Sequence, residues 1–484
     1  MTRVKIREIR LTLGVFVAAL GVLLVRFLVP RPIGMADNGD GWRILCRLGA
    51  RELDRPSEYF VRFSYGPAPA CNSEYISSQS WIDKIASEIG QWLGSSAILN
   101  LLVLGVLGCL LVAGGIAAIV VGLRLSVRDS FIATAALLLV AADSAFFGYF
   151  ASVLSEGAAF VGMLLLAGGL LLMHRTGPWR YTGAAVTVLG AMIGINAKSQ
   201  TLLLIPLFAL ALLFVRPAGS RGLARWALPL AVLAVVGTGT ALVQGAGDSA
   251  NAEYREANMY HVVFNGIVDG NHDTIGDLAA LGLPPEFAKY IGTGWWSANA
   301  AWRSPEYAQY RDKISRRNVA QYYLDHPGRV VQMLQRSAQE TLTARVPNLG
   351  SFGEHAGQPP LAKEYRIPVL SGITGWIAPL GLFALLPIWL LIGWAGLRAF
   401  RDRTGRRDVG IVVLMFLLFA MGQLLVSGLA EGIENVKHQQ LTIYPTLLAA
   451  AFAALSFLPR RKEVPSAVEE PEPELAVAQR GGAQ

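Results

Sequence analysis

About ten long apolar runs constrain the fold of this chain more than any other feature of its sequence. A helix needs about 20 apolar residues to cross the hydrocarbon core of a bilayer, because each residue adds only about 1.5 Å of rise. Only 16% of the residues are charged, whereas a soluble domain carries about 25%. We therefore predict an all-α integral membrane protein, a polytopic bundle of about ten transmembrane helices. The expected spans are residues 9–30, 97–123, 131–149, 157–173, 181–195, 201–215, 226–243, 376–397, 408–427 and 441–458.

Two of these runs, residues 181–195 and 201–215, are short for a membrane span. They could form a tight hairpin that does not fully cross the bilayer, or two tilted helices packed within the bundle. The first run, residues 9–30, follows a basic start and is longer than the apolar region of a cleaved signal peptide. We read it as an uncleaved signal anchor.

Lys and Arg gather in alternate connecting segments, and this bias predicts the orientation in the membrane. With the N-terminus inside, the basic segments at residues 3–10, 398–407 and 460–462 all face the cytoplasm. The short turns expected on the outer side hold only Lys198 and Lys437. The sequence therefore predicts a multi-pass protein of the cell membrane with both termini in the cytoplasm.

Two long segments are expected outside the membrane. Residues 31–95 carry mixed charge, and residues 245–375 should form a mainly helical extracytoplasmic domain with helices over 305–324 and 327–346. The tail is rich in Pro and Glu, which is typical of disorder. The expected organisation is a cytoplasmic start with the first transmembrane helix (1–30), a first extracytoplasmic loop (31–95), a transmembrane bundle (96–244), an extracytoplasmic domain (245–375), C-terminal transmembrane helices (376–460) and a disordered cytoplasmic tail (461–484).

The net charge of +8 raises the question of nucleic-acid binding. Most basic residues lie in short loops between apolar runs, and no basic face with interleaved aromatic residues is present, so no nucleic-acid partner is expected. Membrane lipids are the expected surroundings. Cys46 and Cys71 share the first outer loop, where an oxidising environment permits a disulfide, although sequence cannot show its geometry.

Ionisable and amide side chains interrupt the apolar sequence repeatedly at the expected outer membrane interface. The candidate catalytic residues are Asp40 and Asp37, which follow the first span in the segment MADNGDGWR. The candidate substrate-binding residues come from that segment and from three later turns, and they are Arg43, Glu156, Lys198, Gln200, Glu434, Lys437 and His438. Charges at the edge of a bilayer are costly and often functional.

Such a group would suit a hydroxyl acceptor and a phosphate-bearing donor. A carboxylate can take a proton from the attacking hydroxyl, and a cation can stabilise a leaving phosphate. Each residue also has a structural reading, because Asn-Gly-Asp is strong turn chemistry and because Asp143 and Glu156 fall at expected helix ends. A divalent metal ion stays open as a cofactor, although no closely spaced His or Cys residues support one; no cofactor is otherwise expected.

Short motifs in a consistent order resemble those of bacterial glycan-biosynthesis hexosyltransferases of the WsfD type. On the outer turns these are Asn38-Gly39-Asp40, Ser155-Glu156, Ala197-Lys198-Ser199-Gln200 and Val436-Lys437-His438. In the 245–375 segment they are Asn265-Gly266-Ile267, LAALGL at 278–283, Tyr290-Ile291-Gly292 and YYLDHP at 322–327. The resemblance spans about residues 36–445, and it departs from the family pattern at Gly41-Trp42 and at Gly157.

The resemblance implies a GT-C-like membrane glycosyltransferase with a polyprenyl-phosphate sugar as donor and a cell-envelope glycan or lipid as acceptor. It implies Asp40 as the general base, with Asp37 as second candidate, and Lys198, Lys437 and His438 on the donor phosphate. Two alternatives stay open, a lipid-linked glycan polymerase or ligase, and a flippase or transporter, which would want ionisable residues at mid-membrane. A scaffold that presents the outer domain would leave the charged turns unexplained. Trp295, Trp296 and Trp302 could stack on sugar rings or pack in a core.

Overall fold

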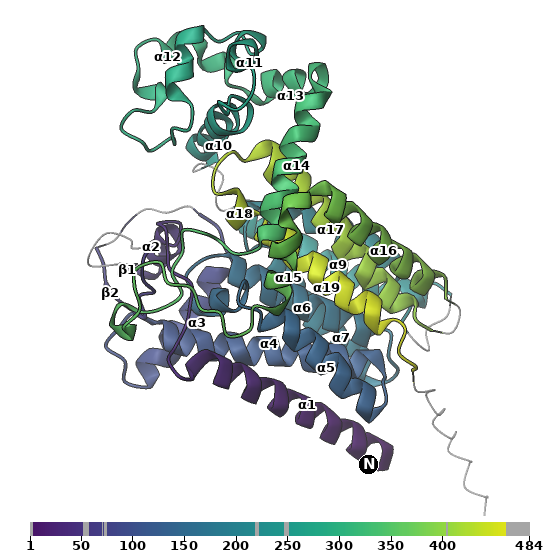
Figure 1. Ribbon diagram of the computed structural model, residues 1–484. Helices are drawn as coiled ribbons and strands as arrows, with labels where there is room; N and C mark the ends of the chain where they lie inside the picture. Colours follow the sequence, from purple (N-terminus) through teal and green to yellow (C-terminus); the bar gives the residue numbers. More distant parts are fainter. Residues whose placement is uncertain are drawn as a thin grey trace, which may run out of the picture.

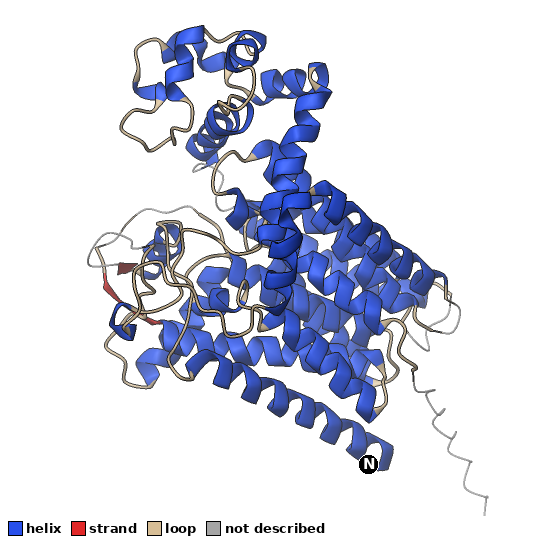
Figure 2. Ribbon diagram, in the orientation of Figure 1, coloured by secondary structure: helices blue, strands red, loops and turns tan. Residues whose placement is uncertain are grey.

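The protein is almost entirely helical (Figure 1 and Figure 2). The computed structural model describes residues 3–51, 58–69, 71, 75–217, 222–245, 251–402 and 405–460, so the tail at 461–484, expected to be disordered, lies outside the described residues. Within these ranges six helices are long and apolar enough to cross a membrane, which confirms the all-α polytopic membrane architecture. They are α1 (Arg3–Leu28), α4 (Leu101–Leu123), α6 (Glu156–Met173), α9 (Ala224–Gly245), α16 (Leu382–Arg401) and α17 (Arg407–Ala430).

The other four expected spans are shorter or less apolar helices of the same bundle. They are α5 (Val127–Ala141), α7 (Pro178–Ile195), α8 (Leu204–Phe214) and α19 (Gln440–Leu455). The span expected over 131–149 is wrong in its second half, because the helix ends at Ala141. Beyond that end, buried Asp143 accepts hydrogen bonds from the backbone N–H groups of Ala145, Leu370 and Ser371. This carboxylate therefore joins the end of α5 to the start of α15 (Val369–Ile377).

Helix α6 forms the centre of the bundle and is buried along its whole length. It packs between α4 and α7 and also contacts α17 and α19. A helix that is apolar all round is expected in such an interior position. Because Glu156 is the first residue of α6, its carboxylate is placed at one end of the bundle, in the middle of the helix array.

The outside of the bundle carries large exposed apolar side chains. On α15 and α16, Trp376 and Phe383 are each more than 80% exposed, and Leu390 is 73% exposed. A soluble protein rarely shows so continuous an apolar surface. These residues instead match a helix face that contacts lipid chains.

A second, smaller helical body projects from one end of the bundle, at the top of Figure 1. It comprises α10 (Asn251–His261), α11 (Thr274–Ala280), α12 (Tyr307–Tyr310) and α13 (Arg316–Asp325), and it has its own core with Tyr260, Phe264 and Phe287. The single helix expected over 305–324 is broken, because the Asn318 amide donates to the carbonyl groups of Lys313 and Leu281 and holds a turn there. We call residues 251–326 the outer body.

Helix α14 (Pro327–Thr343) leads from the outer body back onto the bundle, where it packs against α15, α16 and α17. The segment after α1 contains α2 (Trp42–Leu48), α3 (Gln79–Trp92) and a small antiparallel sheet. Its strand order is β1 (Ala50–Arg51), β2 (Ser64–Pro67) and β3 (Leu99–Asn100), with Ala50 opposite Pro67 and Ser64 opposite Asn100. Cys46 and Cys71 form a disulfide beside this sheet, which answers the question that the sequence left open.

Candidate functional site

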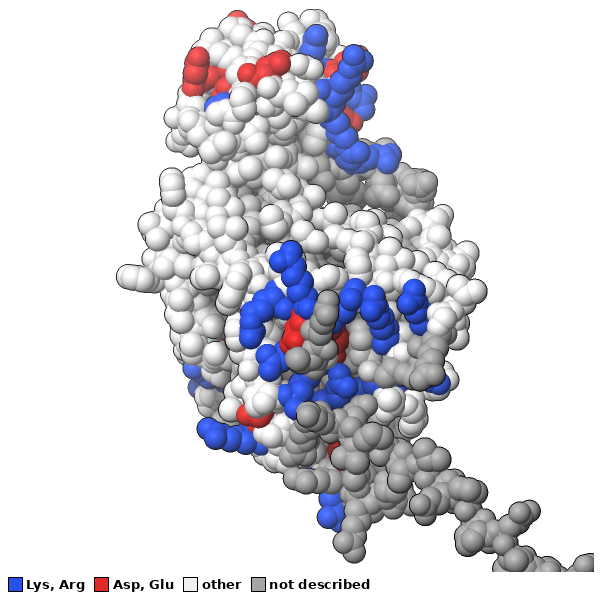
Figure 3. Space-filling model, turned by 90° about the vertical axis from the view of Figure 1, so that its right-hand side faces the viewer, with Lys and Arg blue, Asp and Glu red and all other residues white. Residues whose placement is uncertain are grey.

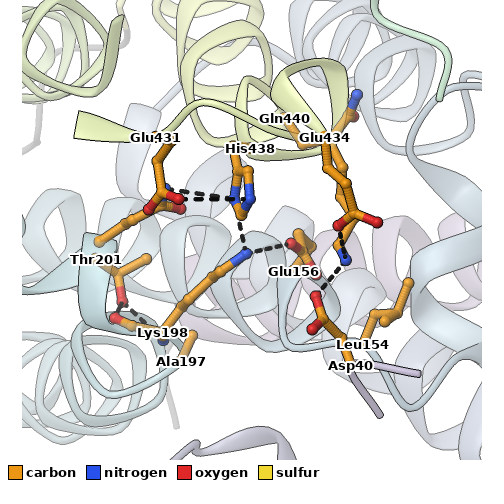
Figure 4. Close-up of polar contacts among 12 residues, drawn as sticks. Asp40, Leu154, Glu156, Ala197, Lys198, Thr201, Glu431, Glu434, His438 and Gln440 are labelled. Carbon is orange, nitrogen blue, oxygen red and sulfur yellow. Dashed lines mark hydrogen bonds and ion pairs between the residues drawn. The ribbon is translucent and has the colours of Figure 1, made fainter. Parts of the chain in front are cut away.

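Four chain segments bring charged side chains together at the end of the bundle that faces the outer body. They are the turn after α1, the first turn of α6, the connection between α7 and α8, and the connection between α17 and α19, which contains the short helix α18 (Asn435–His438). Figure 4 shows that their side chains point toward one another. We call this group the interfacial cluster; its members are Asn38, Asp40, Arg43, Glu156, Lys198, Gln200, Glu431, Glu434, Lys437 and His438.

Lys437 is the centre of one half of the interfacial cluster. Its ammonium forms an ion pair with Asp40 and donates to Glu434 Oε2 at 2.9 Å and to Asn38 Oδ1 at 3.0 Å. On the other side of Asp40, Arg43 donates to Oδ1 at 2.7 Å. The Lys437 side chain is only 1% exposed, whereas that of Asp40 is 34% exposed. Asp40 and Glu434, whose side chain is 28% exposed, are therefore the carboxylates of this half that an incoming molecule can reach.

The charges around Asp40 determine its protonation state. Burial by itself would raise its pKa, but attraction by Lys437, Arg43 and Lys198 outweighs burial and holds the pKa well below its usual range. The pKa of Lys437 is correspondingly raised, because Asp40 and Glu434 outweigh its burial. Asp40 is thus ionised at every physiological pH and stays a weak base as long as the cations hold it.

Lys198 is the centre of the other half of the cluster. Its ammonium donates to Glu156 Oε1 at 3.0 Å and to His438 Nδ1 at 3.2 Å. Burial, together with the nearby charges of Lys198 and Lys437, holds the pKa of His438 well below its usual value. The imidazole is therefore neutral, and since Nδ1 faces an ammonium donor, the proton lies on Nε2.

Gln200 and Glu431 complete this half. The Gln200 amide donates to Glu431 Oε1 at 3.2 Å, and Glu431 Oε2 lies 3.8 Å from His438 Nε2. Burial raises the pKa of Glu431 to about 7, although Lys198 and Gln200 oppose this change. Glu431 is not among the candidate residues predicted from the sequence, because its raised pKa depends on burial that the sequence does not show.

Asp37, the second candidate base, takes a different position. Its Oδ1 accepts the backbone N–H groups of Gly39 at 3.0 Å and Gly41 at 2.8 Å, and the side chain is buried. This arrangement forms the turn that presents Asp40. A Cβ at position 41 would clash with the Val153 side chain and with the Asp37 carboxylate, which accounts for the glycine where the resembling family would have an aromatic residue.

The second departure from the family pattern also has a packing reason. A Cβ at Gly157 would clash with the carbonyl oxygen of Tyr149, so α6 can begin at Glu156 only if a glycine follows. Asp143 does not join the interfacial cluster, since it binds the start of α15 as described above. This tight packing of the chain beside Glu156 accounts for Gly157, where the resembling family has a different residue.

Two aromatic residues that the sequence did not single out contact Arg43. The guanidinium lies 4.4 Å from the ring centroid of Tyr75 and 4.8 Å from that of Tyr254. Tyr254 belongs to α10, so the outer body reaches the cluster through this contact. Of the three tryptophans considered for sugar stacking, Trp295 and Trp302 stack on each other at 5.1 Å, whereas Trp296 is 60% exposed.

The cluster is rich in carboxylates, which makes a divalent metal ion worth testing against the geometry. Among the residues that the structure describes, no group of three or more His, Cys, Asp or Glu side chains is arranged to hold a metal ion. Asp40, Glu156 and Glu434 each contact an ammonium group instead.

The chain is similar to known proteins over most of its length. The model of the family described as the YfdI N-terminal transmembrane domain matches residues 2–453. No curated protein sequence matches the chain. Among solved structures, the chain is similar to an Archaeoglobus fulgidus oligosaccharyltransferase tethered with an acceptor peptide containing the NVT sequon. The identity is 12% and the TM-score 0.39, over 92% of this chain and 49% of that chain.

Proposed function

The chain belongs to the family of the YfdI N-terminal transmembrane domain, and we propose that it is a membrane glycosyltransferase of the GT-C class, similar to hexosyltransferases of the WsfD type. It would move a hexose from a polyprenyl-phosphate-linked donor to a glycan or lipid of the cell envelope, in the cell membrane, on the extracytoplasmic side, with both termini in the cytoplasm. The observation that carries the proposal is Asp40, an accessible carboxylate held by Lys437 and Arg43 at the end of the bundle that faces the outer body.

The chemistry needs one base and one site for an anion. Asp40 takes the proton of the acceptor hydroxyl while the hydroxyl oxygen attacks the anomeric carbon of the donor. The bond between that carbon and the phosphate oxygen breaks, and polyprenyl phosphate leaves. Because a phosphate is already a good leaving group, cations that stabilise its charge suffice and no general acid is required.

The position of the cations supports this division of roles. Lys437, Arg43 and Lys198 all act electrostatically on Asp40, so a phosphate bound among them would share the same charges. The isoprenoid chain of the donor is too apolar to leave the bilayer, which requires that its phosphate be met at the bundle end rather than in the outer body.

The donor would also activate the base. In the free protein Lys437 and Arg43 hold the pKa of Asp40 well below its usual range. A donor phosphate would compete for the same ammonium and guanidinium groups and so weaken their hold on the carboxylate. The pKa of Asp40 would then rise toward a value that suits a general base, and the base would become effective only when donor is bound.

The remaining members of the cluster would position these groups. Glu156 and Glu434 orient the two lysines by direct hydrogen bonds. His438 and Gln200 lie beside Lys198 and would offer neutral hydrogen-bond donors to a phosphate or a sugar hydroxyl.

A transfer assay with purified protein in nanodiscs tests the proposal. Radiolabelled polyprenyl-phosphate hexose and a membrane lipid extract are supplied to the wild type, to Asp40→Asn and to Asp312→Asn, an exposed carboxylate of the outer body. Label should enter a new glycoconjugate with the wild type and Asp312→Asn and not with Asp40→Asn.

Two outcomes would redirect the proposal. Transfer from an oligosaccharide carrier, but not from a monosaccharide carrier, would indicate a polymerase or ligase. Absence of transfer from both carriers, under conditions in which a known transferase is active, would favour a flippase or a scaffold.

A further inference from the structure

The end of the bundle opposite the interfacial cluster contains a cavity of about 750 Å³. The ends of α4, α6, α8 and α16 and the beginning of α17 meet there, and the lining includes Arg124, His174, Arg216, Arg401 and Arg407. A smaller hollow of about 480 Å³ adjoins it and shares Arg401. Figure 3 shows Lys and Arg side chains gathered on this face around a few acidic ones. We call the larger hollow the arginine cavity.

The acidic side chains at the arginine cavity are already engaged. Asp408 pairs with Arg460 at 2.9 Å, and Asp402 lies 3.8 Å from Arg406. Arg216, Arg401 and Arg407 have no carboxylate within 4.0 Å among the described residues. Within the described part of the chain, these three arginines therefore bring positive charge to the cavity without a carboxylate partner.

Arg407 is held in place by aromatic rings rather than by an acid. Its guanidinium lies 4.6 Å from the ring centroid of Phe400 and 5.6 Å from that of Phe214. Its Nε is buried and finds no hydrogen-bond partner in the described part of the chain. A buried donor of this kind, beside an open cavity, indicates a missing acceptor.

A general bias for positive charge on the cytoplasmic side explains why arginines occur in these loops. It does not explain why they converge on one hollow, because like charges held together raise the energy of the folded state. Arg216 and Arg407 are near enough to repel each other, and Arg216 is kept beside the cavity by its backbone N–H bond to His174 Nε2. Arg128, by comparison, lies exposed at the same end and outside the cavity.

We propose that the arginine cavity binds the phosphate group of an anionic membrane phospholipid. Guanidinium groups bind phosphate through paired, charge-assisted hydrogen bonds. Leu213 and Phe214 of α8 and Leu397 of α16, two helices that end at the cavity, are exposed apolar side chains, so acyl chains could continue from the cavity along a lipid-facing surface. Basic pockets between transmembrane helices at headgroup depth suit such lipids. This inference does not depend on the proposed transferase activity.

Thermal unfolding of the full chain in a nonionic detergent tests the inference. The unfolding midpoint is followed with rising phosphatidylglycerol, with phosphatidylcholine of the same acyl chains, and with inorganic phosphate against sodium chloride at equal ionic strength. Phosphatidylglycerol should raise the midpoint of the wild type and of Arg128→Gln. The double variant Arg216→Gln/Arg407→Gln should need about tenfold more of that lipid for the same rise.

Three results would overturn the inference. They are an equal rise with phosphatidylcholine, an equal response of the double variant and the wild type to phosphatidylglycerol, and a rise with inorganic phosphate alone, which would mean a site for soluble phosphate. Without lipid, the double variant should unfold at or above the wild-type midpoint, since a repulsion has been removed. If the double variant fails to fold, Arg407→Lys replaces it in the test, because lysine keeps the charge but loses the planar fork of the guanidinium. A wild-type response of Arg407→Lys to phosphatidylglycerol would count against the inference.

Discussion

Lys437 and Asp40 lie 397 positions apart in the chain and form an ion pair at the end of the helix bundle. The ammonium is fully enclosed, while a third of the carboxylate side chain stays exposed. This asymmetry means that the lysine holds the site together and the aspartate faces whatever enters. The consequences for activity and for stability can be tested separately.

Replacing Lys437 should slow transfer strongly while it lowers the stability of the protein only modestly. Under the proposed function, Lys437→Gln would remove a cation from the leaving phosphate, and loss of one such group slows catalysis by about 10² to 10³-fold. The partners Asp40 and Glu434 remain partly exposed, so water can solvate them and the unfolding midpoint should fall only modestly. Steady-state transfer rates and thermal unfolding of the variant measure the two effects. Lys313→Gln, at an exposed lysine of the outer body, is the matched control, and an equal loss of rate in both variants would contradict the role of Lys437.

Stability should depend on pH through Glu431. Burial raises its pKa from 4.5 in the unfolded chain to about 7 in the folded protein, so the folded state binds a proton more tightly. The resulting stabilisation is fully present below pH 4.5 and is lost as the pH rises through 7, and it amounts to about 3 kcal/mol at most. Asp40 acts in the opposite sense. Because its pKa is lowered in the folded protein, its contribution to stability is present above its ordinary pKa and disappears as the pH falls below that value. Thermal unfolding midpoints between pH 4.5 and 8 should therefore fall in the wild type and stay flatter in Glu431→Gln; parallel curves would refute the assignment.

Gly157 should not tolerate a side chain. In Gly157→Ala the new methyl group meets the Tyr149 carbonyl oxygen, and relieving that overlap should cost about 1–3 kcal/mol and displace Glu156 from Lys198. Gly114→Ala is the matched control, because a Cβ there meets nothing within 4 Å inside helix α4. The control should be neutral or slightly stabilised, since alanine favours helix over glycine. If the unfolding midpoints of both variants equal that of the wild type, the beginning of α6 can shift to accept the methyl group.

Tyr254 should couple the outer body to the interfacial cluster. Its ring packs on Arg43, and an interaction of this kind contributes about 0.5–1 kcal/mol at a partly exposed site. Tyr254→Ala should raise the KM for the donor severalfold, because Arg43, one of the cations proposed to bind the donor phosphate, becomes less ordered. Tyr254→Phe keeps the ring and should restore the wild-type KM. If the phenylalanine variant is as impaired as the alanine variant, the hydroxyl rather than the ring carries the effect.

The membrane architecture could be predicted from apolar runs because spanning a bilayer requires long continuous stretches of the chain itself. Positions of the ten helices follow the expected runs closely, and the helix expected from Pro327 appears as α14. The prediction fails where a polar side chain binds a distant segment. Asp143 ends α5 early by binding the start of α15, and Asn318 interrupts the helix expected over 305–324.

Burial of single charges could not be read from the chain. Arg26 lies inside the first apolar run, and the sequence offers no reason to single it out. In the structure it is buried against Glu364, 338 positions away. A charge within a transmembrane helix becomes acceptable only when its partner is known, and that partner comes from the segment leading into α15.

The candidate site likewise has one part that the sequence could predict and one part that it could not. The sequence by itself determined that Asp40, Lys198 and Lys437 fall at one end of the helix bundle, because the order of apolar runs leaves each turn on a definite side. The roles proposed for them stay predictions.

Only the tertiary structure decided which of these side chains touch. It placed Lys437 on Asp40 and Lys198 between Glu156 and His438, and it put Asp37 into the supporting turn. Periodicity and hydropathy are properties of neighbouring residues, which one segment carries alone. Ion pairs at a site depend on how separate helices pack and on how deeply each charge is removed from water, and that information exists only once the bundle has formed.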